Sequence, residues 1–107
     1  MSLSTHVLDL ELGMPASGIP VTLAQGDRII GNGLTDSDGR FADFFKENKI
    51  QPGSYELVFN VGTYFSNRGV DTFYVEIPVK FEISDSTRHY HVPLLLSPFG
   101  YSTYRGS

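Results

Sequence analysis

The chain contains no cysteine and no tryptophan. Without cysteine there can be no disulfide, thiolate metal ligand or cysteine nucleophile, and the redox compartment stays open. Any reactive chemistry must therefore come from histidine, arginine, tyrosine, serine or carboxylates. Long apolar runs are missing too, because no stretch approaches the roughly 18 residues of a membrane span. We therefore expect no membrane contact.

Positive charge is also scarce, with 8 Lys and Arg against 12 Asp and Glu and a net charge of −4. Proteins that bind nucleic acids usually cluster basic residues on one surface, whereas these are scattered along the sequence. We therefore expect no nucleic-acid partner. Residues 1–6 lack the basic segment and apolar run of a secretory signal, which favours a cytoplasmic location.

The sequence does have a strong alternation of apolar and polar residues. Its 107 residues are enough for a single domain, which we expect to span residues 1–107. Every odd position from Phe73 to Ile83 is apolar, which predicts a strand with one buried face. Pro78 within it indicates a sheet edge or a bulge, because proline has no N–H for pairing. Residues 19–23 and 54–60 predict two further strands.

Turn-forming residues separate these runs, and one short helix is predicted. The turns are predicted at residues 25–27, 31–33, 36–39 and 51–53, where glycine, proline, asparagine or aspartate gather. The helix is predicted over residues 63–68, between two glycines. Short strands at this spacing predict an all-β antiparallel sandwich.

Two strands are apolar on both faces, at residues 5–10 and 89–96. A strand with two apolar faces is buried on both sides. The chain is long enough for only two layers, so a second subunit should cover the outer face. We therefore predict an oligomer whose interface encloses the polar groups of these strands.

All three histidines, His6, His89 and His91, lie on these two strands. In the second strand the even positions from Tyr90 to Leu96 form the core face, which directs His89 and His91 to the interface. The pattern does not fix the side that His6 takes. Imidazoles act as general acids and bases near neutral pH. They could instead only satisfy hydrogen bonds, or the three together could bind zinc.

Arg40 follows the predicted turn at residues 36–39. It is either a solvated turn arginine or a fixed cation that stabilises a developing oxyanion. Asp36 and Asp38 are better explained by turn formation than by catalysis.

The C-terminal segment, residues 97–107, stays aromatic and patterned to its end, whereas most chain ends fray. A docked end would bring Tyr104, Arg105 and the terminal carboxylate of Ser107 to a defined site. No Gly-x-Ser-x-Gly motif or Ser-His-Asp set indicates a nucleophilic serine.

Four segments together closely resemble the 5-hydroxyisourate hydrolases, also called transthyretin-related proteins. They are Ser-Thr-His-Val-Leu-Asp at 4–9, Asp-Gly-Arg at 38–40, His-Tyr-His-Val-Pro-Leu-Leu-Leu-Ser at 89–97 and Tyr-Ser-Thr-Tyr-Arg-Gly-Ser at 101–107. The resemblance covers essentially the whole chain. It implies a transthyretin-like sandwich of two four-stranded sheets with one short helix. It further implies a homotetramer, a dimer of dimers, with active sites at the dimer–dimer interface.

The resemblance also implies the reaction, in which 5-hydroxyisourate is hydrolysed to 2-oxo-4-hydroxy-4-carboxy-5-ureidoimidazoline during urate degradation. Its motifs assign catalysis to His6, Arg40 and His91, without metal or other cofactor. The same motifs assign substrate binding to His6, Arg40 and the C-terminal residues Tyr104, Arg105, Gly106 and Ser107. His89 is common in the family pattern but is not counted among its main catalytic groups.

Two alternatives remain at this stage. Transthyretin is a carrier with the same fold, and its channel lacks this set of histidines, arginine and C-terminal motif. The other alternative is an interaction sandwich whose histidines only tune assembly. Fold alone does not separate these functions, so the residues of the site must.

Overall fold

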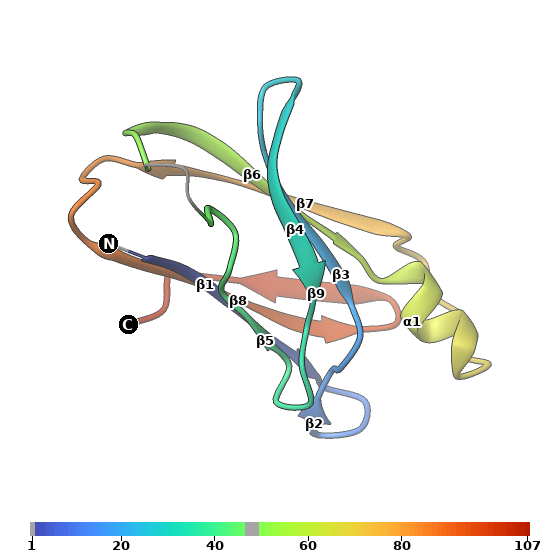
Figure 1. Cartoon of the computed structure of the whole chain (residues 1–107). Coiled ribbons are helices and arrows are strands. Elements are labelled where there is room, and N and C mark those ends of the chain that lie inside the picture. Colours follow the sequence, from blue (N-terminus) through green and yellow to red (C-terminus); the bar gives the residue numbers. More distant parts are fainter. Residues whose placement is uncertain (1, 47–49) are drawn as a thin grey trace.

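The computed structural model describes residues 2–46 and 50–107, and its strands form two sheets that face each other (Figure 1). One sheet has the order β2-β1-β8-β9, with β5 also paired to β1, and the other has the order β4-β3-β6-β7. The strands of the first sheet are β1 (Ser2–Asp9), β2 (Met14–Pro15), β5 (Arg40–Phe41), β8 (His89–Ser97) and β9 (Gly100–Thr103). Those of the second are β3 (Pro20–Gln25), β4 (Arg28–Leu34), β6 (Gly53–Asn60) and β7 (Glu76–Ile83), and the helix is α1 (Gly62–Asn67).

The predicted all-β sandwich with one short helix is confirmed. The first sheet contains five strands rather than four, because β2 and β5 are two-residue strands that pair with successive parts of β1. Across the described residues, no helix is both long and apolar enough to cross a membrane.

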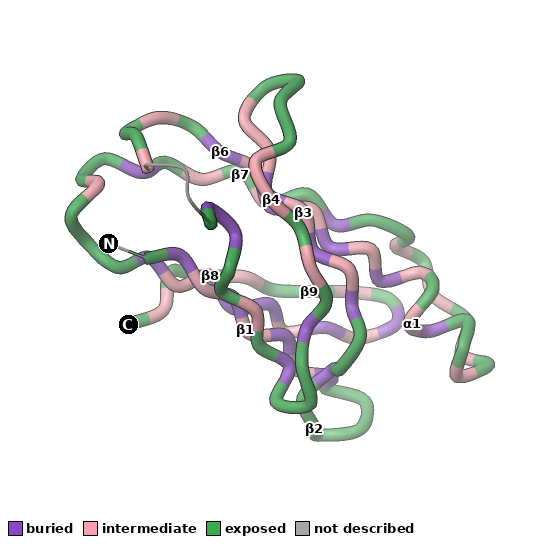
Figure 2. Tube along the Cα trace, in the orientation of Figure 1, coloured by how far each residue is buried: buried purple, intermediate pink, exposed green. Residues whose placement is uncertain are grey.

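Alternate residues of the strands point between the sheets and form the core (Figure 2). On β6 the inward side chains are Tyr55, Leu57 and Phe59, and on β3 they are Val21 and Leu23. Burial of each such side chain contributes about 1.5–3 kcal/mol to folding. The strands predicted at 19–23 and 54–60 and the helix at 63–68 are therefore confirmed with shifts of one or two residues at their ends.

The strand predicted from Phe73 begins only at Glu76. The carbonyl of Val75 accepts hydrogen bonds from the N–H groups of Val61 and Gly62, just before and at the start of α1. Phe73 donates its N–H to the carbonyl of Pro98. The backbone of this segment thus bonds to the helix start and to the β8–β9 turn. Beyond it, β7 pairs among the described strands only with β6, so Pro78 lies in an edge strand as predicted.

The turn predicted at residues 31–33 is wrong, since these residues lie within β4. A Cβ atom at Gly31 would overlap the carbonyl of Phe44, and one at Gly33 would overlap the ring of Phe41. The two glycines therefore let residues 41–44, from the end of β5 onward, cross closely over β4, where a side chain would not fit.

The two strands predicted to be apolar on both faces, β1 and β8, are parallel neighbours with Ser2 opposite His89 and Asp9 opposite Leu96. Their inward residues are buried, including Leu3, Val7 and the even positions from Tyr90 to Leu96. We call the outward side the histidine face. It consists of Ser2, Ser4, His6 and Leu8 on β1 and His89, His91, Pro93 and Leu95 on β8.

A buried carboxylate attaches α1 to the end of β1. The side chain of Asp9 accepts hydrogen bonds from the Tyr64 hydroxyl at 2.6 Å and from Arg68 at 2.9 Å. It also accepts bonds from the N–H groups of Glu11 and Leu12. Burial, together with the hydrogen bond to Asp9, raises the pKa of Tyr64 to about 12. Asp9 thus serves the fold, since its side chain points into the sandwich and away from the histidine face.

Candidate active site

The pairing of β1 with β5 places Arg40 directly beside His6. The two residues are register partners in antiparallel strands, as are Thr5 and Phe41. Side chains of such partners leave the sheet on the same side, with Cβ atoms about 5 Å apart. His6 therefore lies on the outer face, which the sequence pattern left open, and Arg40 shares that face with it.

Hydrogen bonds to Asp36 stabilise the turn before β5 and so position Arg40 beside His6. The Asp36 carboxylate accepts hydrogen bonds from the N–H groups of Asp38 at 2.9 Å and Arg40 at 3.0 Å. These bonds, led by that from Arg40, hold the pKa of Asp36 below its ordinary value. Gly39 closes the turn with φ +75°, and its carbonyl accepts the N–H of Val7. The predicted turn-forming role of Asp36 is confirmed.

His91 reaches the same face from β8, opposite Ser4. Ser4 precedes His6 by two residues on one side of β1, a separation of roughly 7 Å. The Ser4 hydroxyl lies 2.7 Å from His91 Nδ1. With Nδ1 engaged in this way, Nε2 is the ring nitrogen left for chemistry.

The environment of His91 favours its neutral form. Burial lowers the pKa of His91, and the charge of Arg40 and the neighbouring imidazoles of His6 and His89 lower it further. A neutral imidazole with a lowered pKa can accept a proton from water near pH 7. His91 is therefore suited to act as a general base, with Arg40 nearby as a fixed cation.

The C-terminal segment lies against His91, as the sequence predicts for a docked end. Gly106 forms a bridge with His91 and donates its N–H to the His91 carbonyl at 2.8 Å. A Cβ atom at Gly106 would lie 2.5 Å from the His91 ring and 3.2 Å from Pro93. Only glycine fits at this contact, so the segment and the ring are tightly matched.

The remaining C-terminal residues flank this contact. His91, Tyr104 and Arg105 line part of a hollow of about 340 Å³ between β7 and the C-terminal segment. The Arg105 guanidinium lies over the ring of Tyr90, 4.6 Å from its centroid. Ser107 is exposed. The structure thus brings His6, Arg40 and His91 to one face by strand register and places Gly106 against His91, whereas the Arg105 side chain lies over the inward-facing Tyr90.

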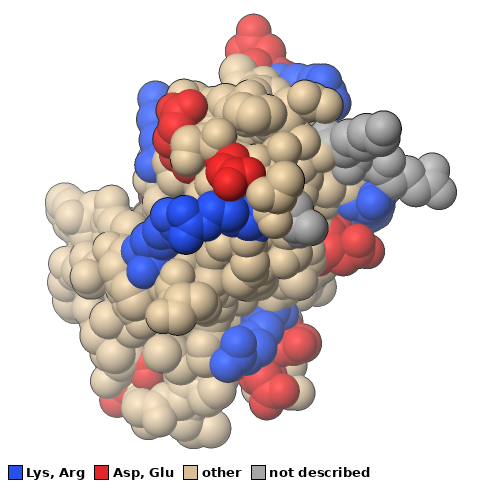
Figure 3. Space-filling model, turned by 90° about the vertical axis from the view of Figure 1, so that its left-hand side faces the viewer, with Lys and Arg blue, Asp and Glu red and all other residues tan. Residues whose placement is uncertain are grey.

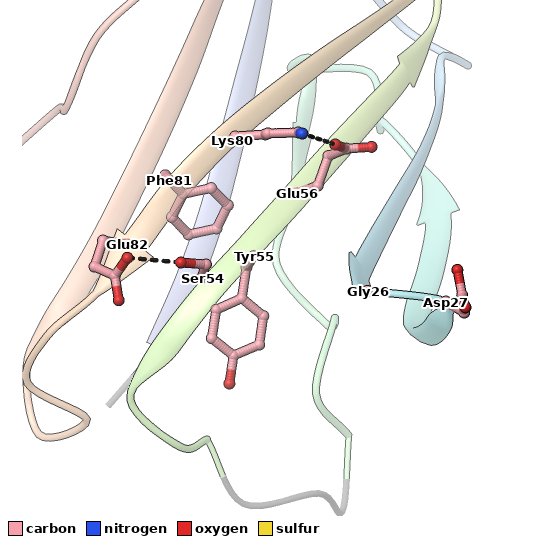
Figure 4. Close-up of a pocket in the computed structure, with 8 residues that line it drawn as sticks. All are labelled: Gly26, Asp27, Ser54, Tyr55, Glu56, Lys80, Phe81 and Glu82. Atoms are coloured by element: carbon pink, nitrogen blue, oxygen red, sulfur yellow. Dashed lines mark hydrogen bonds and ion pairs between the residues drawn. The ribbon is translucent and has the colours of Figure 1, made fainter.

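A second hollow lies on the other sheet and has a different character (Figure 4). It is lined by the β3–β4 hairpin and by parts of β6 and β7. Its polar side chains bond to one another, Ser54 to Glu82 at 2.7 Å and Lys80 to Glu56 at 4.0 Å. No histidine lines it, so we do not assign the chemistry there.

On the end of the sandwich where both termini lie, the described basic and acidic side chains are interspersed (Figure 3). Among residues 2–46 and 50–107, no three or more His, Cys, Asp or Glu side chains are arranged to hold a metal ion.

The sequence profile of the HIUase/Transthyretin family matches residues 3–106 of the chain. The chain belongs to this family. One relative, the 5-hydroxyisourate hydrolase of Salmonella dublin, is 50% identical over 109 residues, which cover 98% of this chain and 80% of the relative.

Similar solved structures include a 5-hydroxyisourate hydrolase and a transthyretin. The Klebsiella pneumoniae 5-hydroxyisourate hydrolase has a TM-score of 0.90 and 34% identity, with all of both chains covered. Sea bream transthyretin, solved in complex with thyroxine, also has a TM-score of 0.90 at 30% identity, over 97% of this chain and 93% of that chain. The backbone therefore does not separate the two kinds of protein.

Two residues of this region, Ser2 and Ser4, were not predicted from the sequence. Both share a face with His6 by period two, which was a usable signal. Their bonding to His89 and His91 depends on the pairing of β1 with β8, across more than 80 residues, and one sequence does not reveal that pairing.

Proposed function

We propose that the chain hydrolyses 5-hydroxyisourate in urate degradation, with residues 1–107 acting as one hydrolase domain. Membership of the family and the relatives named 5-hydroxyisourate hydrolase support this proposal. The observation that carries it is the register that puts His6 beside Arg40 and directs both to the face of His91.

In the proposed mechanism, His6 and His91 share the proton transfers. One deprotonates the attacking water, and one protonates the ring nitrogen that leaves when the six-membered ring opens. Arg40 polarises the attacked carbonyl and stabilises the oxyanion that forms. Tyr104 and the following residues Arg105, Gly106 and Ser107 bind and orient the heterocycle, so the water and the carbonyl meet in a reactive geometry. No metal takes part.

The proposed site is completed by other copies of the chain. Half-buried apolar residues, Leu8 and Leu95, share the histidine face with His6 and His91. In one subunit this face is open, whereas hydrolysis of an unstable heterocycle benefits from an enclosed, oriented site. We propose a homotetramer, a dimer of dimers, with the active sites between dimers.

The test is a turnover assay with 5-hydroxyisourate freshly generated from urate and followed by its ultraviolet decay. Wild-type protein should accelerate the decay, and His6→Ala, Arg40→Ala and His91→Ala should each lower the rate, by roughly a hundredfold or more for a general base. Decay that is identical with and without wild-type protein would refute the hydrolase proposal. Loss of turnover on exhaustive chelation would refute the metal-independent mechanism.

The carrier alternative is distinguished in the same preparation. A carrier should bind iodinated or other aromatic ligands in its channel, as calorimetry would detect, and should not turn over 5-hydroxyisourate. The presence of His6, Arg40, His91 and the C-terminal motif favours the enzyme.

A further inference from the structure

Four side chains form a continuous hydrogen-bonded row on the histidine face. Ser2 and Ser4 of β1 alternate with their register partners His89 and His91 of β8. The Ser2 hydroxyl bonds His89 Nδ1, His89 Nε2 lies 3.3 Å from the Ser4 hydroxyl, and the Ser4 hydroxyl lies 2.7 Å from His91 Nδ1. The row therefore joins His91 to Ser2 through both nitrogens of His89.

Every member of this row can donate and accept a hydrogen bond. A serine hydroxyl does both, and a neutral imidazole donates from one nitrogen and accepts at the other. The row consequently has two complete arrangements. In one, each proton is directed from His91 toward Ser2, and in the other each is directed from Ser2 toward His91. A shift of one proton at each link converts one arrangement into the other.

The row also runs from the interior of the site toward water. His91 and Ser4 are half-buried, whereas His89 and Ser2 are exposed. Arg40 and His6 lie near His91, and burial together with the charge of Arg40 disfavours a positive charge on the His91 ring. A proton taken up by His91 is therefore more stable at the exposed end of the row, on His89 or Ser2, than on the His91 ring.

The proposed reaction releases a proton that such a row could carry. The attacking water brings two protons, of which one goes to the leaving ring nitrogen. The other is lost because the product carboxylic acid ionises at neutral pH. One proton must thus leave the site in each turnover.

We propose that the row of Ser2, His89, Ser4 and His91 is a proton relay that discharges this proton to solvent, an inference that rests on the proposed hydrolase function. His91 Nε2 takes a proton from the attacking water, and His91 Nδ1–H passes its proton to the Ser4 hydroxyl. The Ser4 proton moves to His89 Nε2, the His89 Nδ1 proton moves to Ser2, and the Ser2 proton passes to water. Each residue gains one proton and loses one, so the row returns to charge neutrality but is left in its opposite arrangement. After the product leaves, loss of the His91 Nε2 proton to water and uptake of a proton by Ser2 from water restore the first arrangement. His89 is then the relay residue, and Ser4 also positions the His91 ring.

The test is rescue of a relay variant by a soluble proton carrier. Turnover of wild type and His89→Ala is measured in weak buffer, with the uncatalysed rate subtracted, as imidazole is added. We expect kcat of His89→Ala to fall about tenfold, less than the loss of a full general base. Imidazole should restore it, while wild type should not respond. His89→Gln, which keeps a polar side chain, should show the same loss and rescue.

The link through Ser4 is tested by Ser4→Ala, which should lower kcat more than it changes KM, and by Ser4→Thr, whose retained hydroxyl should restore turnover. Ser54→Ala is the matched control, since this serine on β6 also bonds a side chain but lies on the other sheet. Full activity of His89→Ala in weak buffer, or a loss that imidazole does not restore, would overturn the relay and leave the hydrolase proposal standing. Absence of wild-type turnover would instead refute the hydrolase proposal.

Discussion

At the scale of single residues, the site depends on keeping one imidazole neutral among positive charges. Burial lowers the pKa of His91, and Arg40 is the next largest cause. The same guanidinium is placed to stabilise an oxyanion, so one cation serves two purposes. It keeps the base unprotonated, and it favours the charge that develops on the attacked carbonyl.

The pH dependence of turnover should reveal this coupling. As pH falls through the lowered pKa of His91, the ring becomes protonated and kcat/KM should fall, with the midpoint below the ordinary histidine value of 6.5. Arg40→Gln removes a positive charge, so the pKa of His91 should rise and the acidic limb should move to higher pH. The remaining activity will be lower, but the midpoint of the limb can still be measured.

A matched control is Arg28→Gln, which removes an exposed arginine from β4 on the other sheet. Its acidic limb should coincide with that of wild type. If the limb of Arg40→Gln did not move, or moved to lower pH, the electrostatic coupling between Arg40 and His91 would be wrong.

At the scale of elements, the sequence predicted strands that a local pattern determines. It did not predict features that depend on pairing between distant segments. The alternation of apolar and polar residues located β3 and β6, because each of these segments carries its own pattern of buried alternate residues. The glycines at 31 and 33 were misassigned to a turn, because their partners, Phe44 and Phe41, approach from another segment.

The candidate site shows the same division. Family motifs singled out His6, Arg40 and His91, but their grouping follows from the pairing of β1 with β5 and β8. The positions of Ser2 and Ser4 became meaningful only with that register. No property of the local sequence specifies which strand lies beside β1, since strand pairing depends on the topology of the whole fold.

The contact between the C-terminal segment and β8 gives a prediction at this scale. Gly106→Ala should place a methyl group against the His91 ring, 2.5 Å away, and displace either the ring or the segment. Because small misplacements in an active site have large effects on rate, we expect kcat/KM to fall by roughly tenfold or more. Steady-state kinetics with fresh 5-hydroxyisourate would measure this loss.

Gly100→Ala is the comparison variant, because its new methyl group would come no closer than 3.7 Å to the Ser97 hydroxyl. It should keep nearly full activity. Equal activity of Gly106→Ala and Gly100→Ala would contradict the tight match between the segment and His91.

At the scale of the whole molecule, several large apolar side chains are exposed, and they bear on the proposed tetramer. Leu10, Leu12 and Met14 directly follow the site-bearing strand β1 and are each about half exposed, at 55%, 49% and 57%. Phe99, in the turn between β8 and β9, is 70% exposed. Several large apolar groups open to water on the elements that carry the site favour association.

We expect wild-type protein to have four times the 11.9 kDa mass of the chain when measured by size exclusion with light scattering. Leu12→Lys should shift it to smaller species, because a buried unpaired charge costs several kcal/mol. Turnover should fall in parallel, since the proposed site requires neighbouring subunits. Ile29→Lys, at a 65% exposed position on β4, should leave mass and turnover unchanged. A fully active wild-type monomer would contradict the proposed assembly.

The parallel pairing of β1 with β8 has a consequence for how the protein is made. Strands β3, β4, β6 and β7 pair with one another within residues 20–83, whereas Ser2 and its partner His89 are 87 positions apart. Contacts of such high sequence separation form slowly and late in folding. A chain still emerging from the ribosome can therefore complete one sheet while its first strand waits for β8. Catalytic competence should arrive as one of the last events of biosynthesis.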